Sequence, residues 1–100
     1  MTSYNKLVRD KIPDMLDKKG ISYEKRIASD EEYKAELIKK LEEEVKEFIE
    51  AESVEELADV MEVVEALKNL PNYIDVEKVR VEKLEDRGGF TQKIILKGEK

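Results

Sequence analysis

The sequence contains neither cysteine nor histidine, and it has only four glycines and two prolines among its 100 residues. The absence of both side chains excludes disulfides, zinc sites built on them, thiol catalysis and imidazole acid–base chemistry. Carboxylates, lysines and arginines must therefore supply any chemistry. The scarcity of glycine and proline favours packed helices over a turn-rich sandwich.

Long apolar runs are also missing. No run approaches the roughly 20 residues that a membrane span needs, and the polar start lacks the apolar stretch of a signal peptide. We therefore expect a cytoplasmic protein with no membrane partner. A net charge of −6 argues against a basic surface that binds a nucleic-acid duplex.

The length and composition favour one mainly helical domain spanning residues 1–100. Splitting so short a chain would leave each part too small to bury a sufficient core. Charged residues make up 44% of the chain and apolar residues 40%, which suits amphipathic helices. One helical hairpin buries little surface alone, so we also expect a homodimer or a higher homo-oligomer.

Two long helices are predicted in the middle of the chain, over residues 29–51 and 53–70. Each begins with a capping box, a serine followed three residues later by a glutamate. The two pairs are Ser29 with Glu32, and Ser53 with Glu56. Apolar stripes follow both caps at helical spacing, and Pro71 ends the second helix. The short turn between the helices makes them antiparallel neighbours.

Shorter elements are predicted on either side of this hairpin. Helical spacing of apolar residues indicates a helix over residues 8–19, and another over 75–86 with Asp75 as its N-cap. Alternating apolar residues in 21–28 and an apolar run in 90–96 favour extended structure. These two segments are expected to pair as a small two-stranded accessory sheet.

Acidic residues concentrate on the two long helices. Eleven acidic residues and one basic residue, Lys46, lie between Glu42 and Glu65. Projection at about 100° per residue places Glu44 within the apolar stripe of the first helix. Glu56 falls within the stripe of the second helix, and Asp59 falls at its edge. The hairpin therefore directs carboxylates from both helices toward its interior.

Ionised carboxylates in such a setting are costly, because each is partly desolvated and repels the others. A divalent cation resolves the conflict, and Mg²⁺ prefers oxygen ligands while keeping positions for water and phosphate. The candidate ligands are Glu44, Glu47, Glu56 and Asp59. A structural interpretation competes with this one, because Glu56 can complete a cap on Ser53 and Glu44 can pair with Lys40.

These acids lie in a recognisable arrangement. The segments Glu44-Val45-Lys46-Glu47 and Glu56-Leu57-Ala58-Asp59 resemble the paired ExxE and ExxD motifs of the MazG-like all-α nucleotide pyrophosphohydrolases. The first segment of the chain, from Tyr4 to Pro13, and Arg87-Gly88-Gly89-Phe90 resemble the two ends of a short phosphoribosyl-ATP pyrophosphohydrolase-like subgroup. One departure is the spacing, because only eight residues separate Glu47 from Glu56, fewer than the family's usual linker.

The resemblance implies a MazG-like antiparallel helical bundle and an enzyme that uses Mg²⁺, with Mn²⁺ as a substitute. Its substrate would be a nucleoside triphosphate or a phosphoribosyl-ATP-like nucleotide. Cleavage of the α–β phosphoanhydride would yield a monophosphate and pyrophosphate. Glu43 or Glu47 would act as the catalytic base, and Glu43 can instead form an ordinary ion pair with Lys39.

Cations near both ends of the chain are candidates for binding the phosphate chain. The set is Lys6, Arg9, Lys83 and Arg87. Arg9 and Arg87 are favoured because they lie in the two segments that resemble the family. The ordinary role of such residues is a solvated surface charge. Two other functions stay open: a noncatalytic nucleotide-binding or helical assembly module that retains the fold, and an acidic helical scaffold without a metal.

Overall fold

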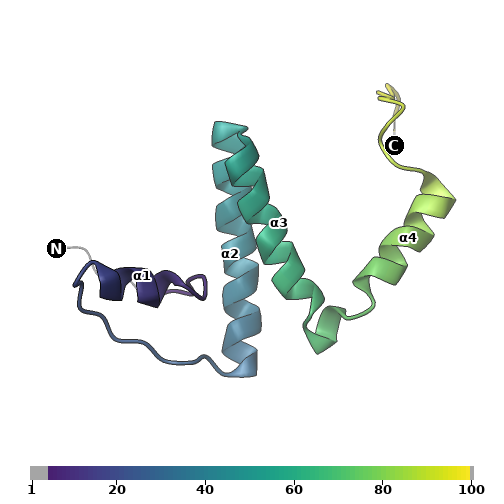
Figure 1. Cartoon of the computed structure of the whole chain (residues 1–100). Helices are drawn as coiled ribbons and strands as arrows, with labels where there is room; N and C mark the ends of the chain where they lie inside the picture. The colour runs from purple at the N-terminus through teal and green to yellow at the C-terminus, as the bar shows by residue number, and fades with distance from the viewer. Residues whose placement is uncertain (1–4, 100) are drawn as a thin grey trace. The chain divides into compact units, whose positions relative to one another are not determined.

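A computed structural model describes residues 5–99 and shows a mainly helical chain (Figure 1). Its α-helices are α1 (Ile12–Lys18), α2 (Asp30–Ala51), α3 (Val54–Lys68) and α4 (Val76–Arg87), and a 3₁₀ turn covers Pro71–Tyr73. The described residues form two compact units, one ending at Leu67 and the other beginning at Lys68. Within this part of the chain, no helix is long and apolar enough to cross a membrane.

The first long helix, α2, begins and ends where local chemistry requires. Ser29 is its N-cap, with extended backbone angles, and its Oγ accepts a hydrogen bond from the Glu32 N–H at 3.2 Å. Glu52 ends the helix in the left-handed region, with φ 52° and ψ 31°. Its N–H donates to the Phe48 carbonyl at 2.7 Å. The expected helix over residues 29–51 is confirmed.

The second long helix, α3, follows after the two-residue turn Glu52-Ser53. The Ser53 Oγ accepts from the Glu56 N–H at 3.2 Å, as the second capping box predicts. The helix ends at Lys68, two residues before the expected boundary, because the chain becomes extended at Leu70 ahead of Pro71. So short a turn leaves α2 and α3 antiparallel and side by side.

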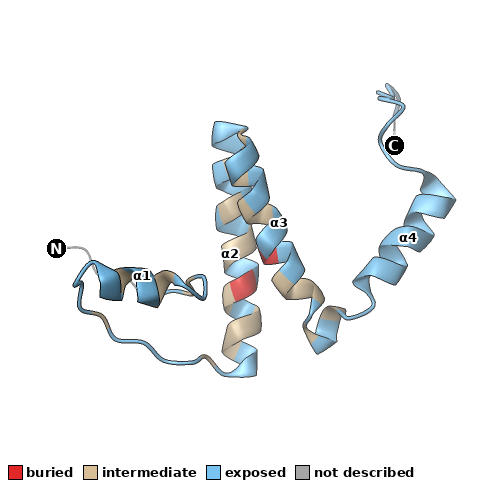
Figure 2. Ribbon diagram, viewed as in Figure 1, coloured by how far each residue is buried: buried red, intermediate tan, exposed pale blue. Residues whose placement is uncertain are grey.

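The core of this hairpin is a thin seam between its two helices. Leu37 on α2 and Val63 on α3 are 4% and 8% exposed, and they are the buried hydrophobic residues of the described chain (Figure 2). The half-buried apolar residues beside them are Leu41, Phe48, Val60 and Leu67. The apolar stripes read from the sequence therefore do meet, but they bury little.

The helix expected over residues 8–19 is shorter in the structure. α1 begins at Ile12 with Pro13 in its first turn, where a missing N–H costs nothing. The residues just before it form a turn, closed by the Ile12 N–H donating to the Arg9 carbonyl at 3.1 Å. The helix stops before Gly20, which adopts φ 70°.

The expected two-stranded sheet is not seen in residues 5–99, where neither 21–28 nor 90–96 forms a strand. The second segment turns instead: the Lys93 N–H donates to the Phe90 carbonyl at 3.2 Å, and Lys93 has φ 61°. The reason is physical, because an isolated pair of strands is only marginally stable and β-propensity acts through packing.

The last helix, α4, belongs to the second unit. Asp75 occupies its N-cap position, but the Asp75 side chain makes no capping hydrogen bond. An ion pair between Glu77 and Arg80 lies in its first turns, with the Arg80 Nε donating to a Glu77 oxygen at 3.0 Å. Gly88 ends the helix with φ 78°, and its N–H donates to the Leu84 carbonyl at 2.8 Å.

Candidate metal centre

Three carboxylates from the hairpin meet across its seam. Glu44 comes from α2, and Glu56 and Asp59 come from the first two turns of α3. Each offers one oxygen, and the three oxygens all lie within 4.8 Å of one another. The two-residue turn brings this about, because it sets the first turns of α3 beside the last turns of α2. These positions fit oxygen ligation of one divalent cation.

Two of these half-buried carboxylates each have one oxygen that is buried without a hydrogen-bond partner in the described structure. The Glu44 side chain is only 12% exposed. The second oxygens of Glu44 and Glu56, both Oε2, are buried, and neither has a hydrogen-bond partner in the described structure. Buried polar atoms are normally paired, so each of these two oxygens is a position where a water or a cation can bind. Three carboxylates with two such oxygens form a donor set that fits a divalent cation.

The electrostatics of the cluster are those of like charges held together. Burial raises the pKa of the Glu44 carboxyl above its usual value, the neighbouring Glu47 carboxylate raises it further, and the Lys40 ammonium opposes the shift. Burial likewise raises the pKa of Glu56, followed by the charges of Glu47 and Asp59. A bound cation would reverse this balance by favouring the ionised forms.

Glu47, the fourth expected ligand, is exposed and lies outside the group of three. Its charge still acts on both Glu44 and Glu56, so it lies close to the cluster. The structure therefore brings together three of the four predicted ligands. Glu47 sits at their margin, where a carboxylate can contact water beside the cluster.

Two cations contact the cluster. The Arg9 Nη1 lies 3.1 Å from the Asp59 Oδ1, which joins the segment before α1 to α3. The Lys40 Nζ lies 3.7 Å from one oxygen of Glu44 and 3.7 Å from one oxygen of Glu43. Lys40 was absent from the predicted phosphate-binding set, although its position four residues before Glu44 was the signal for this ion pair.

Lys6 and Glu43 border a separate hollow of about 400 Å³ on the charged side of α2. Its other lining residues are Leu7, Glu36, Lys39, Lys40, Glu42 and Lys46. Lys39 pairs with Glu36 at 3.7 Å, so the expected pair of Lys39 with Glu43 is replaced by the Lys40 contact. Lys40 thus belongs to both the hollow and the carboxylate cluster.

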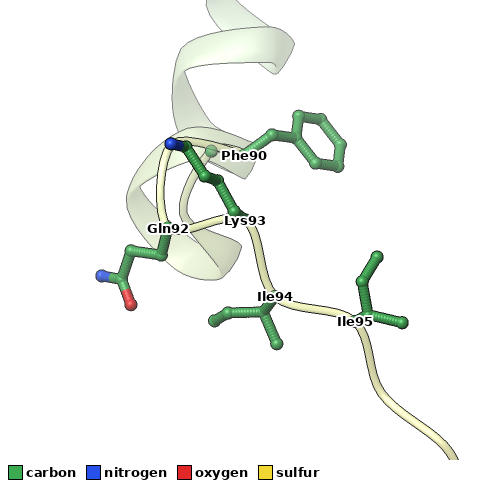
Figure 3. A pocket seen from close by; sticks show the side chains of 6 residues that line it. Phe90, Gln92, Lys93, Ile94 and Ile95 are labelled. Carbon is green, nitrogen blue, oxygen red and sulfur yellow. The ribbon is translucent and has the colours of Figure 1, made fainter.

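The remaining two predicted cations, Lys83 and Arg87, are exposed residues of α4 in the second unit. The Arg87 Nε lies 3.9 Å from the Asp86 Oδ2. Just beyond α4, a hollow of about 310 Å³ is lined by residues 89, 90 and 92–95 (Figure 3). The side chains in Figure 3 spread outward from the chain, and Lys93 is the charged residue among them.

The chain matches no protein-family model, and no curated protein or solved structure is found to be similar to it. The family resemblance of the acidic motifs therefore stays a prediction. The geometry itself shows a helical hairpin with three clustered carboxylates. Two of their oxygens are buried without a hydrogen-bond partner, and two cationic side chains contact the cluster.

Proposed function

We propose that this chain is a magnesium-dependent nucleotide pyrophosphohydrolase of the MazG-like all-α kind, acting in the cytoplasm. The observation that carries the proposal is the meeting of Glu44, Glu56 and Asp59 across the seam, with two buried oxygens left without partners. The resemblance of the ExxE and ExxD segments supplies the reaction class. Proposed substrates are a noncanonical nucleoside triphosphate or a phosphoribosyl-ATP-like nucleotide.

The three clustered carboxylates would hold the cation, with Glu47 as a further ligand at the margin. When bound there, Mg²⁺ supplies charge neutralisation for the phosphate chain and lowers the pKa of a coordinated water. Mn²⁺ has the same ligand preference and is a suitable substitute. The orphaned Oε2 atoms of Glu44 and Glu56 are the acceptors that a cation or its waters would satisfy.

The chain's own residues have distinct roles in this proposal. Arg9 already places its guanidinium at the edge of the cluster, 3.1 Å from Asp59, where its remaining N–H groups can donate to phosphate oxygens. Lys6 extends the positive charge along α2. Arg9 and Lys6 orient the phosphate chain rather than react. Lys83 and Arg87, the other two phosphate-binding residues predicted from the resemblance, belong to the second unit.

Glu47 is the better candidate for the catalytic base. It is exposed beside the cluster and is positioned to accept a proton from an attacking water. Glu43 is the second candidate, but its carboxylate is engaged by Lys40 at 3.7 Å. The water oxygen forms a new bond to phosphorus, the α–β anhydride breaks, and pyrophosphate leaves with the bridging oxygen. The water's proton passes to the base.

The test is product identification with matched variants. The full chain is incubated with a panel of canonical and modified nucleoside triphosphates and phosphoribosyl-ATP, with Mg²⁺ or a chelator. We expect Mg²⁺-dependent release of monophosphate and pyrophosphate. Glu44→Gln and Glu56→Gln should lose turnover. Glu62→Gln should keep it, because Glu62 is an exposed glutamate on the same helix as Glu56. Full activity in both site variants would refute the proposed site.

A noncatalytic nucleotide-binding or helical assembly module is the alternative, and one observation favours it. Lys40 and Arg9 already pair with Glu44 and Asp59, so part of the carboxylate charge is neutralised without any metal. Such a module would bind nucleotide in calorimetry without releasing pyrophosphate. Release of orthophosphate alone would indicate a different reaction.

A further inference from the structure

Lys40 is a mostly buried lysine at the edge of the carboxylate cluster. Its side chain is 20% exposed, whereas that of the preceding residue, Lys39, is 73% exposed. Lysine is almost never fully buried, because its ammonium normally stays in water while its carbon stem lies along the protein. A lysine that is largely withdrawn from water beside two carboxylates therefore needs an explanation beyond solubility.

Two glutamates hold the Lys40 ammonium. Its Nζ lies 3.7 Å from one oxygen of Glu44 and 3.7 Å from one oxygen of Glu43. Helix stabilisation accounts poorly for the contact with Glu44, because a lysine four residues before a glutamate is the weaker of the two orientations. The ammonium instead compensates a costly charge, since Glu44 is 12% exposed and its Oε2 has no hydrogen-bond partner in residues 5–99.

Arg9 has the same relation to a carboxylate of the other helix. Its Nη1 lies 3.1 Å from the Asp59 Oδ1. Each helix of the hairpin thus contributes one clustered carboxylate that is already paired with a cation of the chain. A divalent cation that binds Glu44 and Asp59 must therefore compete with two positive charges, and each of them also repels it.

Both cationic side chains can leave these carboxylates without losing all compensation. Lys40 keeps Glu43 as a second partner, and it borders the hollow of about 400 Å³ beside α2. The Arg9 side chain is 63% exposed, so its guanidinium stays hydrated when it turns away from Asp59. Neither movement leaves an unpaired buried charge, which is the strongly destabilising outcome.

A phosphate chain supplies the anionic partner that each displaced cation needs. Lysine binds phosphate as a point charge, and arginine binds it through several N–H groups. Phosphate oxygens that share a cation with Glu44 and Asp59 bring negative charge close to Lys40 and Arg9, because each of these contacts one of the two carboxylates. The same two side chains therefore oppose a bare divalent cation and favour one that is bound together with phosphate.

We propose that Lys40, together with Arg9, is an exchangeable counter-ion that makes the binding of a divalent cation at the cluster depend on phosphate. The inference rests on the proposed function and adds a positioning role for Lys40. In the free chain Lys40 compensates Glu44, and in the complex it turns to the phosphate oxygens while Glu43 keeps its ammonium in place. By linkage, phosphate raises the affinity for the cation by the factor by which the cation raises the affinity for phosphate.

Isothermal titration calorimetry of the full chain tests this with two titrations, one with Mg²⁺ alone and one with magnesium pyrophosphate at saturating Mg²⁺. Lys40→Met keeps an unbranched apolar stem and removes the charge. We expect this variant to bind Mg²⁺ alone about tenfold more tightly, because one repelling charge is gone. It should bind magnesium pyrophosphate about tenfold more weakly, because one charged phosphate contact is gone.

The opposite signs of these two changes separate the proposed exchange from a purely structural role, because a loss of local structure would weaken both affinities. Lys40→Arg keeps the charge and should stay closer to the wild type than Lys40→Met in both titrations. The matched control is Lys39→Met, because the Lys39 Nζ lies 3.7 Å from a Glu36 oxygen and not at the cluster. This control should leave both affinities near those of the wild type. Circular dichroism verifies that all three variants remain helical.

Three outcomes would overturn the inference, and only the last also refutes the proposed function. If the wild type binds Mg²⁺ and Lys40→Met behaves like Lys39→Met, Lys40 has no part in an otherwise intact metal centre. If Lys40→Met loses affinity in both titrations, its role is structural and the metal centre again stands. If neither the wild type nor Lys40→Met binds Mg²⁺, with or without pyrophosphate, the metal centre and the exchange fail together.

Discussion

The candidate centre is tested most directly by measuring the stability of the folded chain at increasing Mg²⁺ concentration, with Glu44 intact or replaced. Glu44→Gln keeps the shape of the side chain and removes the charge that burial and Glu47 disfavour. Without metal at neutral pH, the variant should therefore be more stable than the wild type. With saturating Mg²⁺ the order should reverse, because only the wild type keeps all three clustered ligands. A crossover of this kind distinguishes a ligand from an ordinary surface glutamate.

The size of the effect follows from mass action. A ligand that binds only the folded state adds about 1.4 kcal/mol of stability for each tenfold rise in its free concentration above Kd. For a domain of this size, that corresponds to a rise in Tm of roughly 6–11 °C per decade of Mg²⁺. Two ions would double the slope, so the titration also counts the metal ions. Glu44→Gln should shift the onset at least about tenfold higher in Mg²⁺.

Calorimetric or circular dichroism melts at constant ionic strength measure this slope. Sodium chloride at matched ionic strength controls for screening of the acidic surface. The screening length is about 8–10 Å at roughly 0.10–0.15 M salt. Glu62→Gln controls for the loss of one negative charge from α3. The reasoning is wrong if Glu44→Gln and Glu62→Gln respond to Mg²⁺ alike, or if sodium chloride reproduces the wild-type slope.

Three further predictions concern the fold and its titration. Leu37→Ala should cost about 2–5 kcal/mol in urea unfolding because Leu37 is 4% exposed, whereas Ile27→Ala should change stability by less than about 0.5 kcal/mol. The raised pKa values of Glu44 and Glu56 give stability that is present below their unfolded-state pKa and lost as the pH rises through the folded-state pKa. Metal-free wild type should therefore gain stability relative to Glu44→Gln as the pH falls from neutral toward about 4, and a constant difference across that range would contradict the burial argument. Glu52→Gly should be more stable than Glu52→Ala by about 1 kcal/mol in thermal unfolding, because only glycine adopts φ 52° without strain, and equal stability would contradict this.

The sequence predicts those elements whose signals are local. Ser29 and Ser53 begin the two long helices because each side chain caps a backbone N–H three residues later, which requires no distant contact. The sequence also contains a local signal for the start of α1, because Pro13 is typical of a first helical turn. The helical spacing of Val8 with Ile12 suggested an earlier start than the turn at Arg9 allows.

Elements that depend on distant partners were not predictable in this way. The apolar run in residues 90–96 gives no warning of the turn at Lys93, because such a run forms a strand only when a packing partner exists. In the site, projection correctly directs Glu44 and Glu56 toward the seam, where their Oε2 atoms are buried. The contact of Arg9 with Asp59 joins residues 50 apart and has no local signature.

The charge balance of the seam is what separates a metal centre from a simple acidic scaffold. Glu44, Glu56 and Asp59 carry three negative charges when ionised, and Glu47 adds a fourth that acts on two of them. Arg9 and Lys40 contribute two positive charges, and Lys40 also contacts Glu43. The cluster therefore keeps an excess of about two negative charges beside two orphaned oxygens. A scaffold gains little from this arrangement, because replacing charged residues in a partly buried cluster by apolar residues is generally neutral or stabilising. A divalent cation would remove both the excess charge and the missing contacts. We therefore propose that this cost is kept because the site is functional.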